Sequence, residues 1–240
     1  MEKKIIGILG GMGPLATADL FKKIIEAAEA GCDQEHARVI IDSNTNIPDR
    51  TAAILHGGKD PVPELTESAR LLEKAGAGLL IMPCNTAHFF YESVKAAVSI
   101  PVISMIEAAA SRVVSEGRDR ALILCTDGTR DAGVYDRVFA ARGIKTFYPD
   151  EKVQKALMSI IYEGVKAGVK LSDGDERAQK IRECVELVNA YIEKQGDVIT
   201  LLSCTELPIA RDIYGLKGNF ADPTDCLARA AITAAGYKTK

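Results

Sequence analysis

The 240-residue sequence predicts an α/β fold made of two similar domains, each built on a parallel β-sheet covered by helices. Short apolar runs alternate with longer helical patterns along the whole chain, which is typical of repeated strand–helix units and parallel sheets. Several of these runs are almost entirely apolar, as strands buried on both faces are. The chain also repeats itself at about half its length, which indicates two domains related by pseudo-symmetry.

Apolar runs bounded by turn residues predict the strands, and apolar residues at helical spacing predict the helices. The predicted strands cover residues 5–9, 38–41, 78–82, 102–104, 121–124, 145–148 and 198–202. The predicted helices cover residues 15–30, 62–75, 86–98, 106–116, 129–142, 152–165, 175–194 and 224–235. We expect a first domain of residues 1–105 plus 212–240 and a second domain of residues 106–211.

The internal repeat is the strongest argument for paired domains. Residues 78–86 and 198–205 are both apolar strands that end in a cysteine followed by amide or hydroxyl residues, and Cys84 and Cys204 lie 120 positions apart. A second pair, residues 8–14 and 122–129, opens from a strand through glycine into a helix, with an offset of 115. Each domain therefore places one cysteine at the carboxyl end of a strand, the edge at which parallel α/β sheets bind ligands.

Composition and charge exclude several classes of protein. The chain is 47% hydrophobic and 26% charged, as soluble globular proteins are. Its formal net charge of -3 lacks the basic excess of nucleic-acid-binding proteins. The absence of tryptophan and an aromatic content of 5% favour a small polar ligand over a large recognition surface. We expect no nucleic-acid partner, no membrane segment and no targeting segment.

The cysteines indicate location as well as chemistry. Six cysteines are spread over the chain without a C-x-x-C pair, which predicts reduced thiols in a cytoplasmic protein. Most of them are expected to be small buried residues of the core. Cys84 and Cys204 are the exception, because unrelated core thiols have no reason to end equivalent strands of two repeats. A helix that starts just behind each cysteine would lower the thiol pKa below about 8.5 and favour the thiolate.

Two facing thiols can act as a base and an acid on opposite faces of one carbon, which inverts its stereochemistry without a cofactor. Asn85, Thr86 and Thr205 are small donors suited to capping helices or to holding a carboxylate. Arg50 lies in the amide-rich loop after the second strand. Its guanidinium either clamps a carboxylate or holds that loop to its neighbours.

Two other kinds of site are disfavoured by spacing. Residues 11–16 match G-x-G-x-x-A, yet the next acidic strand-end residue, Asp42, comes 29 positions after Gly13, whereas dinucleotide sites place it about 20 on. A tight turn close to a small ligand is preferred. Cys84 and His88 lie one helical turn apart, but no third ligand is near, so no metal is expected. His88 and Glu206 are interpreted as packing or orienting residues.

Five motifs, in this order, resemble the aspartate/glutamate racemase family and in particular its cofactor-independent aspartate racemase branch. They are GGMGP at 10–14, NIPDRT at 46–51, PCNTAH at 83–88, IYEGVK at 161–166 and SCTEL at 203–207. The resemblance covers nearly the whole chain. It implies a homodimer of two-domain α/β subunits, with the active site in the cleft between the domains and no cofactor.

The resemblance also implies residue roles. Cys84 and Cys204 would be the two catalytic acid/bases, and Arg50 and Lys166 would grip the side-chain carboxylate of the substrate. The α-carboxylate and amino group would be held by Met12, Asn85, Thr86, Thr126 and Thr205. Glu206 occupies a position where glutamate racemases tend to carry histidine, which favours aspartate as the substrate.

The sequence therefore predicts an amino-acid racemase that acts on aspartate and needs no pyridoxal phosphate. Three alternatives stay open. The chain can be a glutamate or broad-specificity amino-acid racemase, or it can be similar to maleate isomerases or hydantoin racemases. The chain can also be a two-domain amino-acid-binding protein without enzymatic activity, although binding alone does not need two equivalent cysteines.

Overall fold

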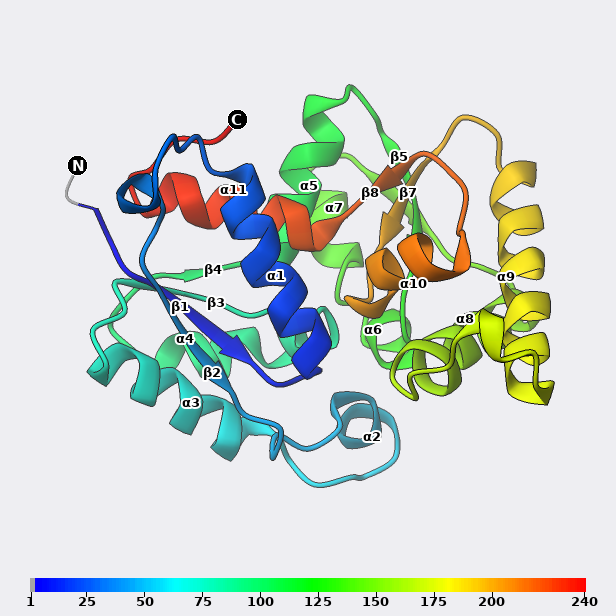
Figure 1. Cartoon of the computed structure of the whole chain (residues 1–240), viewed down its shortest axis with the longest axis horizontal. Helices are drawn as coiled ribbons and strands as arrows, with labels where there is room; N and C mark the ends of the chain where they lie inside the picture. The colour runs from blue at the N-terminus through cyan, green and yellow to red at the C-terminus, as the bar shows by residue number, and fades with distance from the viewer. Residues whose placement is uncertain (1–2) are drawn as a thin grey trace. The chain divides into compact units, whose positions relative to one another are not determined.

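The computed structural model describes residues 3–240, which divide into two compact units (Figure 1). The first unit extends to Ala109 and resumes at Pro223–Lys240, and the second is Ala110–Asp222. Each unit contains one four-stranded parallel sheet within the described residues. The predicted fold class, two α/β domains with similar parallel sheets, is confirmed.

The first sheet has the strand order β2-β1-β3-β4. Its strands are β1 (Ile6–Gly10), β2 (Val39–Ser43), β3 (Leu79–Ile81) and β4 (Val102–Ile103). The accompanying helices are α1 (Pro14–Ala27), η1 (Asp33–Glu35), α2 (Arg50–Leu55), α3 (Val62–Lys74), η2 (Thr86–Phe90), α4 (Tyr91–Ala96) and α11 (Pro223–Ala234). Helix α5 (Met105–Ser115) contains the boundary between the two units.

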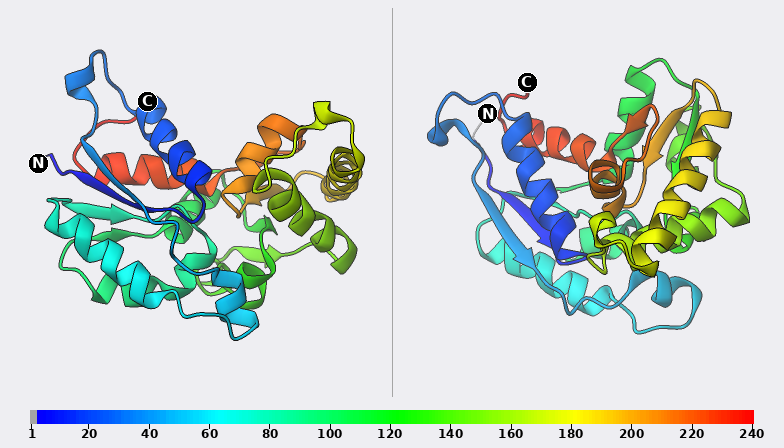
Figure 2. Two further views of the ribbon diagram at one scale, coloured as in Figure 1. Left: turned by 60° about the horizontal axis from the view of Figure 1, so that its bottom comes forward. Right: turned by 45° about the vertical axis from the view of Figure 1, so that its right-hand side comes forward.

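Helices cover both faces of the first sheet. Alternate residues of β1 point to opposite faces, so Ile6 packs in a core with residues of α1 and α11 while Leu9 packs in a second core with residues of α3. Figure 2 shows α1 and α11 side by side. The C-terminal segment is tied to the start of the chain, since the backbone N–H of Lys4 donates to the Ala235 carbonyl at 2.9 Å.

The second sheet repeats this arrangement, with the strand order β6-β5-β7-β8. Its strands are β5 (Arg120–Leu124), β6 (Lys145–Phe147), β7 (Ile199–Leu202) and β8 (Phe220–Ala221). The helices are α6 (Asp127–Asp131), α7 (Asp136–Ala141), α8 (Glu151–Ser159), η3 (Ile160–Val165), η4 (Leu171–Asp173), α9 (Glu176–Lys194) and α10 (Glu206–Tyr214). Residues of α8, α9 and α10 share one core with Leu122, Leu124 and Leu202 of the sheet.

Polar caps fix where several helices begin. Asp49, Asp150 and Asp175 accept hydrogen bonds from backbone N–H groups of the first turns of α2, α8 and α9. Pro14 begins α1, where its missing N–H would have had no helical partner. Pro208 lies in the first turn of α10 for the same reason. Proline thus lies in the first turn of both α1 and α10.

The predicted helix at 152–165 changes its winding part of the way along. After α8 the segment η3 is a π-helix, in which the backbone N–H of Lys166 donates to the carbonyl of Ile161 five residues earlier, at 3.0 Å. Gly164 allows the ring of Tyr214 in α10 to pack closely against this segment, since a Cβ there would lie 3.1 Å from the ring. The wider turn brings Lys166 to the end of the helix.

Each predicted strand is present, and the differences concern short or interrupted elements. The predicted helix at 129–142 is two short helices, α6 and α7, and the one at 86–98 begins as a 3-10 helix, η2. Helices α2 and α10 and the two-residue strand β8 were not predicted. The sequence assigns residues 212–222 to the first domain, whereas β8 pairs with β7 and belongs to the second unit.

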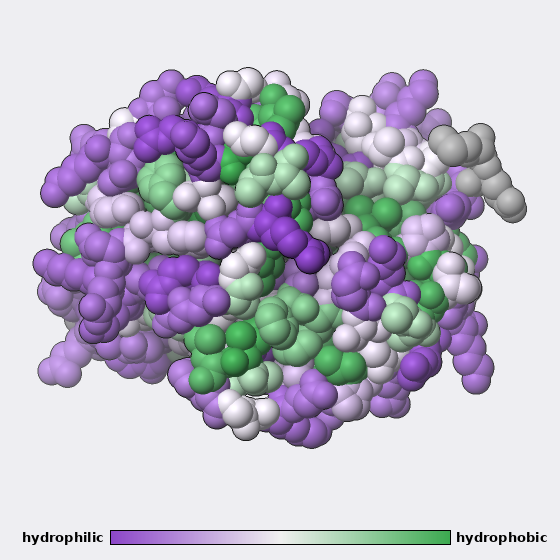
Figure 3. All heavy atoms as spheres, turned by 180° about the vertical axis from the view of Figure 1, so that it is seen from behind, coloured by the Kyte–Doolittle hydropathy of each residue, from purple (hydrophilic) through white to green (hydrophobic). Residues whose placement is uncertain are grey.

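The described residues include no membrane-spanning helix, but several large apolar side chains are exposed. Within residues 3–240, no helix has the length and apolar character needed to cross a bilayer. Figure 3 shows one face of the molecule, on which hydrophobic residues form patches among hydrophilic ones. The large exposed apolar side chains include Leu15, Leu71, Phe89 and Ile213.

Candidate active site

Cys84 lies directly beyond the carboxyl end of β3 in the first unit. The side chains of Cys84, Asn85 and Thr86 are all buried. Asn85 is the N-cap of the 3-10 helix η2, and Thr86 is its first residue. The sequence predicts an α-helix behind Cys84, but the five-residue 3-10 helix supplies fewer aligned peptide dipoles. Asn85 and Thr86 thus follow Cys84 directly at the edge of the sheet.

His88 holds the loop that carries Cys84. The backbone N–H of Met105 donates to Nε2 of His88 at 3.0 Å, so the ring proton is on Nδ1, which lies 2.9 Å from the Cys84 carbonyl oxygen. Burial lowers the pKa of His88 to about 4, so the ring is neutral near pH 7. The ring stacks on Tyr91 at a centroid distance of 5.8 Å. This histidine is a structural link between the Cys84 loop and the start of α5.

Arg50 and Met12 meet at the same edge of the first sheet. The buried guanidinium of Arg50 donates to the carbonyl of Met12 at 3.3 Å, to that of Ile47 at 3.2 Å and to that of Pro48 at 2.8 Å. The Met12 side chain is itself buried in the core beside α3. Arg50 therefore ties the loop after β2 to the turn after β1, which is one of the two roles that the sequence leaves open.

Cys204 lies at the equivalent position of the second unit, beyond the carboxyl end of β7. Its thiol donates a hydrogen bond to Oε2 of Glu206 at 3.0 Å. Thr205, the residue before α10, donates to the same oxygen from its hydroxyl at 3.3 Å. Glu206 is 4% exposed. The carboxylate of Glu206 at the start of α10 thus accepts hydrogen bonds from both the thiol of Cys204 and the hydroxyl of Thr205.

Lys166 reaches the same carboxylate from the end of the π-helix. Its Nζ lies 3.4 Å from Oε1 of Glu206 and 5.1 Å from the ring centroid of Tyr162. Two of the predicted site residues, Cys204 and Lys166, are therefore joined through Glu206, to which the sequence assigns no more than an orienting role. The sequence did offer one sign of this contact, since Glu206 lies in the first turn of a helix, but that helix, α10, was not predicted.

The protonation of Cys204 differs from the prediction. The sequence favours a lowered thiol pKa at both cysteines, whereas burial raises the pKa of Cys204 well above its ordinary value, and the charge of Glu206 raises it further. Lys166 acts in the opposite direction. Burial and the charge of Glu206 thus favour the thiol form of Cys204.

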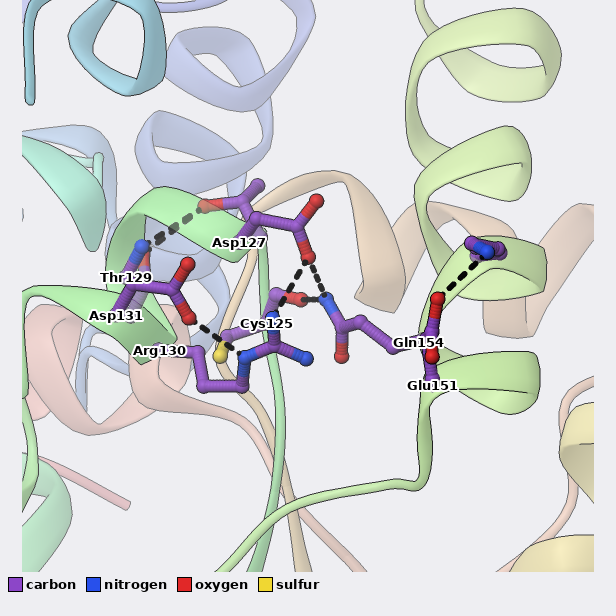
Figure 4. Close-up of polar contacts among 9 residues, drawn as sticks. Cys125, Asp127, Thr129, Arg130, Asp131, Glu151 and Gln154 are labelled. Atoms are coloured by element: carbon purple, nitrogen blue, oxygen red, sulfur yellow. Dashed lines mark hydrogen bonds and ion pairs between the residues drawn. The ribbon is translucent and has the colours of Figure 1, made fainter. Parts of the chain in front are cut away.

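Thr126 lies at the turn after β5, where it caps α6. Its hydroxyl oxygen accepts from the backbone N–H of Thr129 at 3.3 Å. Figure 4 shows that Gln154 of α8 points at this turn, where its Nε2 donates to the Cys125 carbonyl at 2.9 Å and to Oδ1 of Asp127 at 2.8 Å. Gln154 was missed by sequence analysis because nothing in the helical pattern marks it as buried.

Each unit thus assembles its own half of the predicted set at the carboxyl edge of its sheet. The first unit holds Met12, Arg50, Cys84, Asn85 and Thr86, and the second holds Thr126, Lys166, Cys204 and Thr205. All six cysteines are free thiols. In the described part of the chain, no group of three or more His, Cys, Asp or Glu side chains is arranged to bind a metal ion.

Several known proteins are similar to this chain in sequence and fold over most of its length. The broad specificity amino-acid racemase of Bacillus subtilis (strain 168) is 25% identical over 233 residues, which cover 95% of this chain and 97% of the relative. The structure of the aspartate racemase of Picrophilus torridus matches with a TM-score of 0.83 at 30% identity, covering 99% of this chain and 96% of the other. An aspartate racemase homologue from Pyrococcus horikoshii OT3 has a TM-score of 0.73 at 28% identity, covering 97% and 99%.

The family model described as Asp/Glu/Hydantoin racemase matches residues 9–231, a span that contains the predicted site residues of both units. The matched span also includes all the strands of both sheets except the first part of β1. The chain therefore belongs to the Asp/Glu/Hydantoin racemase family, and it is an amino-acid racemase.

Proposed function

We propose that this protein racemises aspartate without a cofactor and uses Cys84 and Cys204 as its paired acid and base. The observation that supports the proposal most strongly is the equivalence of the two thiols. Each follows the third strand of a sheet whose order is the same in both units, β2-β1-β3-β4 and β6-β5-β7-β8. The similarity to aspartate racemases over nearly the whole chain supports aspartate as the substrate.

In the proposed reaction one cysteine, as the thiolate, removes the proton from Cα and becomes a thiol. The electron pair of the broken C–H bond spreads into the α-carboxylate. The other cysteine, as the thiol, donates a proton to the opposite face of Cα and becomes a thiolate. The reverse direction exchanges the two roles.

Donor groups around the substrate carboxylate must stabilise the charge that develops during this step. We assign the α-carboxylate and amino group to the turns after β1, β3, β5 and β7. The residues are Met12, Asn85, Thr86, Thr126 and Thr205. Met12 would contribute backbone groups, because its side chain is buried in the core.

We assign the side-chain carboxylate of aspartate to Arg50 and Lys166. Both are cations near their respective strand-end loops, and Lys166 is the more accessible, with 28% of its side chain exposed. The guanidinium of Arg50 already bonds three carbonyl groups, so part of its role is to shape the loop that receives the substrate. Lys166 then supplies most of the selection for an acidic side chain.

The test is incubation of metal-free and cofactor-free protein with L-aspartate in D2O, followed by chiral chromatography and mass spectrometry. The proposal predicts D-aspartate with one deuterium at Cα. Recovery of unlabelled L-aspartate alone would contradict it. The same assay with glutamate, alanine and lysine separates an aspartate enzyme from a broad-specificity racemase, which the similarity to the Bacillus subtilis relative favours as the second candidate.

The proposal also includes a cytoplasmic homodimer. The cytoplasmic location is supported by six cysteines that all remain free thiols. The dimer follows from the family resemblance of the motifs. Light scattering after size exclusion measures the mass in solution, and a monomer at micromolar concentration would contradict the dimer.

A further inference from the structure

Glu206 connects a predicted acid/base with a predicted specificity residue. One of its oxygens accepts the hydrogen bond from the Cys204 thiol at 3.0 Å, and the other lies 3.4 Å from Nζ of Lys166. The side chain of Glu206 is 5% exposed, whereas that of Lys166 is 28% exposed. The carboxylate is thus buried with the thiol, and its ion-pair partner is a partly exposed ammonium group.

The contact is made between three elements that approach one another in the second unit. Cys204 follows β7, Glu206 begins α10, and Lys166 ends the π-helix η3. Residues of α10 and η3 pack in the same core, which also contains Cys204. Because the three elements are packed together, the carboxylate has little freedom to turn away from either partner.

We propose that Glu206 is a positioning residue whose carboxylate keeps the Cys204 thiol protonated, and that the ammonium group of Lys166 weakens this effect of the carboxylate. The inference rests on the proposed function for the acid/base role of Cys204. When an anionic group of the substrate binds Lys166, the positive charge of Lys166 offsets the charge of Glu206 less, so the carboxylate keeps the thiol protonated more strongly. Recognition of an acidic side chain and proton retention at Cys204 are in this way coupled through one carboxylate.

Electrostatics gives the direction of the coupling. Burial contributes most to the raised pKa of Cys204; after burial, the charge of Glu206 raises this pKa further and the charge of Lys166 lowers it. Thr205 adds a hydroxyl donor to the same carboxylate oxygen that accepts from the thiol. Removing the carboxylate charge makes the thiol easier to ionise, and removing the ammonium charge makes it harder.

The experiment measures the pH dependence of Cys204 alkylation by iodoacetamide, read by peptide mass spectrometry. The midpoint in Glu206→Gln should fall by about one unit or more, because the amide still accepts from the thiol but carries no charge. The midpoint in Lys166→Met should rise. Glu206→Asp keeps the charge and should stay closer to wild type than Glu206→Gln does.

Two internal controls accompany these variants. The alkylation midpoint of Cys84 is read from the same samples and should stay constant. Glu163→Gln removes a carboxylate from the π-helix that pairs with Lys180 and Ser159 instead, and it should leave Cys204 unchanged. If Glu206→Gln does not fold, Lys166→Met tests the same link through a partly exposed side chain.

An unchanged Cys204 midpoint in Glu206→Gln, or a lowered one in Lys166→Met, would overturn the inference. Alkylation needs no turnover, so these outcomes hold whether or not aspartate is racemised. If wild type does not racemise aspartate but the midpoints move as expected, the proposed function fails and the link stands. With turnover, the alkaline limb of the kcat profile should move to lower pH in Glu206→Gln.

Discussion

The Nδ1–H of His88 donates a hydrogen bond to the carbonyl oxygen of Cys84 at 2.9 Å. The same ring accepts from the Met105 backbone at Nε2, so both nitrogens are used while the ring is neutral. Protonation would place a second N–H against the Met105 amide and a charge in a buried site. The loop that carries Cys84 is therefore stable only as long as His88 stays unprotonated.

The first prediction is a loss of stability in acid that depends on His88. Burial lowers the folded-state pKa of His88 to about 4, below an unfolded value of about 6.5. The contribution of this group is complete above pH 6.5 and is lost as the pH falls toward 4, amounting to about 2 kcal/mol by pH 5. Urea unfolding at pH 7 and pH 5 measures it.

The matched control for this measurement is His56→Gln, because His56 is exposed. His88→Gln should be destabilised at pH 7 and should show a smaller further loss at pH 5 than wild type. A wild-type stability that is equal at both pH values would contradict the neutral, buried ring.

The second prediction concerns the catalytic thiols. Cys84→Ser and Cys204→Ser should each lower racemisation of aspartate by at least about a hundredfold, because a serine hydroxyl is a far weaker acid and base at neutral pH. Circular dichroism should show an unchanged fold. Cys184→Ser, a partly exposed cysteine outside the proposed site, is the control and should keep full activity. Normal turnover in either catalytic variant would refute the paired assignment.

The third prediction separates the two cations. Lys166→Ala should reduce the preference for aspartate over asparagine by about tenfold or more, since it removes the more accessible cation. It should also lower the free energy of unfolding, because the buried carboxylate of Glu206 loses its ion pair, so the preference is read at a temperature at which the variant is folded. Lys170→Ala removes an exposed lysine nearby and should leave the preference intact. Equal preferences in Lys166→Ala and wild type would count against the proposed grip.

Arg50 should behave differently from Lys166. Arg50→Lys keeps the charge but cannot reproduce the forked donation to the carbonyl groups of Met12, Ile47 and Pro48. We expect it to lower the free energy of unfolding by about 1–3 kcal/mol as well as the activity. A variant with full stability and altered substrate preference would show that Arg50 acts on the ligand alone.

The fourth prediction concerns Gln154, which holds the turn that carries Thr126. Gln154→Leu leaves the Cys125 carbonyl and Asp127 without this donor and should cost about 1–3 kcal/mol of stability (Figure 4). Gln179→Leu, an exposed glutamine of α9, is the control. Thermal unfolding of the two variants gives the comparison, and equal midpoints would mean that the turn does not depend on Gln154.

The main features of the fold could be predicted from the sequence because they depend on local patterns. Nearly continuous apolar runs identified the buried strands, and the nearly equal offsets of the two repeated pairs of segments identified the equivalent strand ends that carry Cys84 and Cys204. The two-residue strand β8 could not be recognised, because such a short segment has no periodicity. Helix α10 was missed for a related reason, since Pro208 looks like a helix breaker unless the helix start is known.

The contacts around the site depended on side-chain packing and were less predictable. The link between Cys204 and Lys166 passes through Glu206, and 38 positions separate Lys166 from Cys204 along the chain. The π-helix that brings Lys166 there differs from an α-helix by one hydrogen-bond register, which apolar spacing does not reveal. Arg50 shows the same limit, because a charged loop residue gives no sign of whether it bonds to carbonyl groups or to a ligand.

The discontinuous first unit imposes an order on the synthesis of the protein. Its core includes residues of α11, and the backbone N–H of Lys240 donates to the Ala27 carbonyl at 2.9 Å. Residues of α11 are synthesised after the whole of the second unit, Ala110–Asp222, so one face of the first sheet lacks its covering helix while the second unit is already available to fold. The first unit thus begins to be synthesised before the second unit but is completed after it.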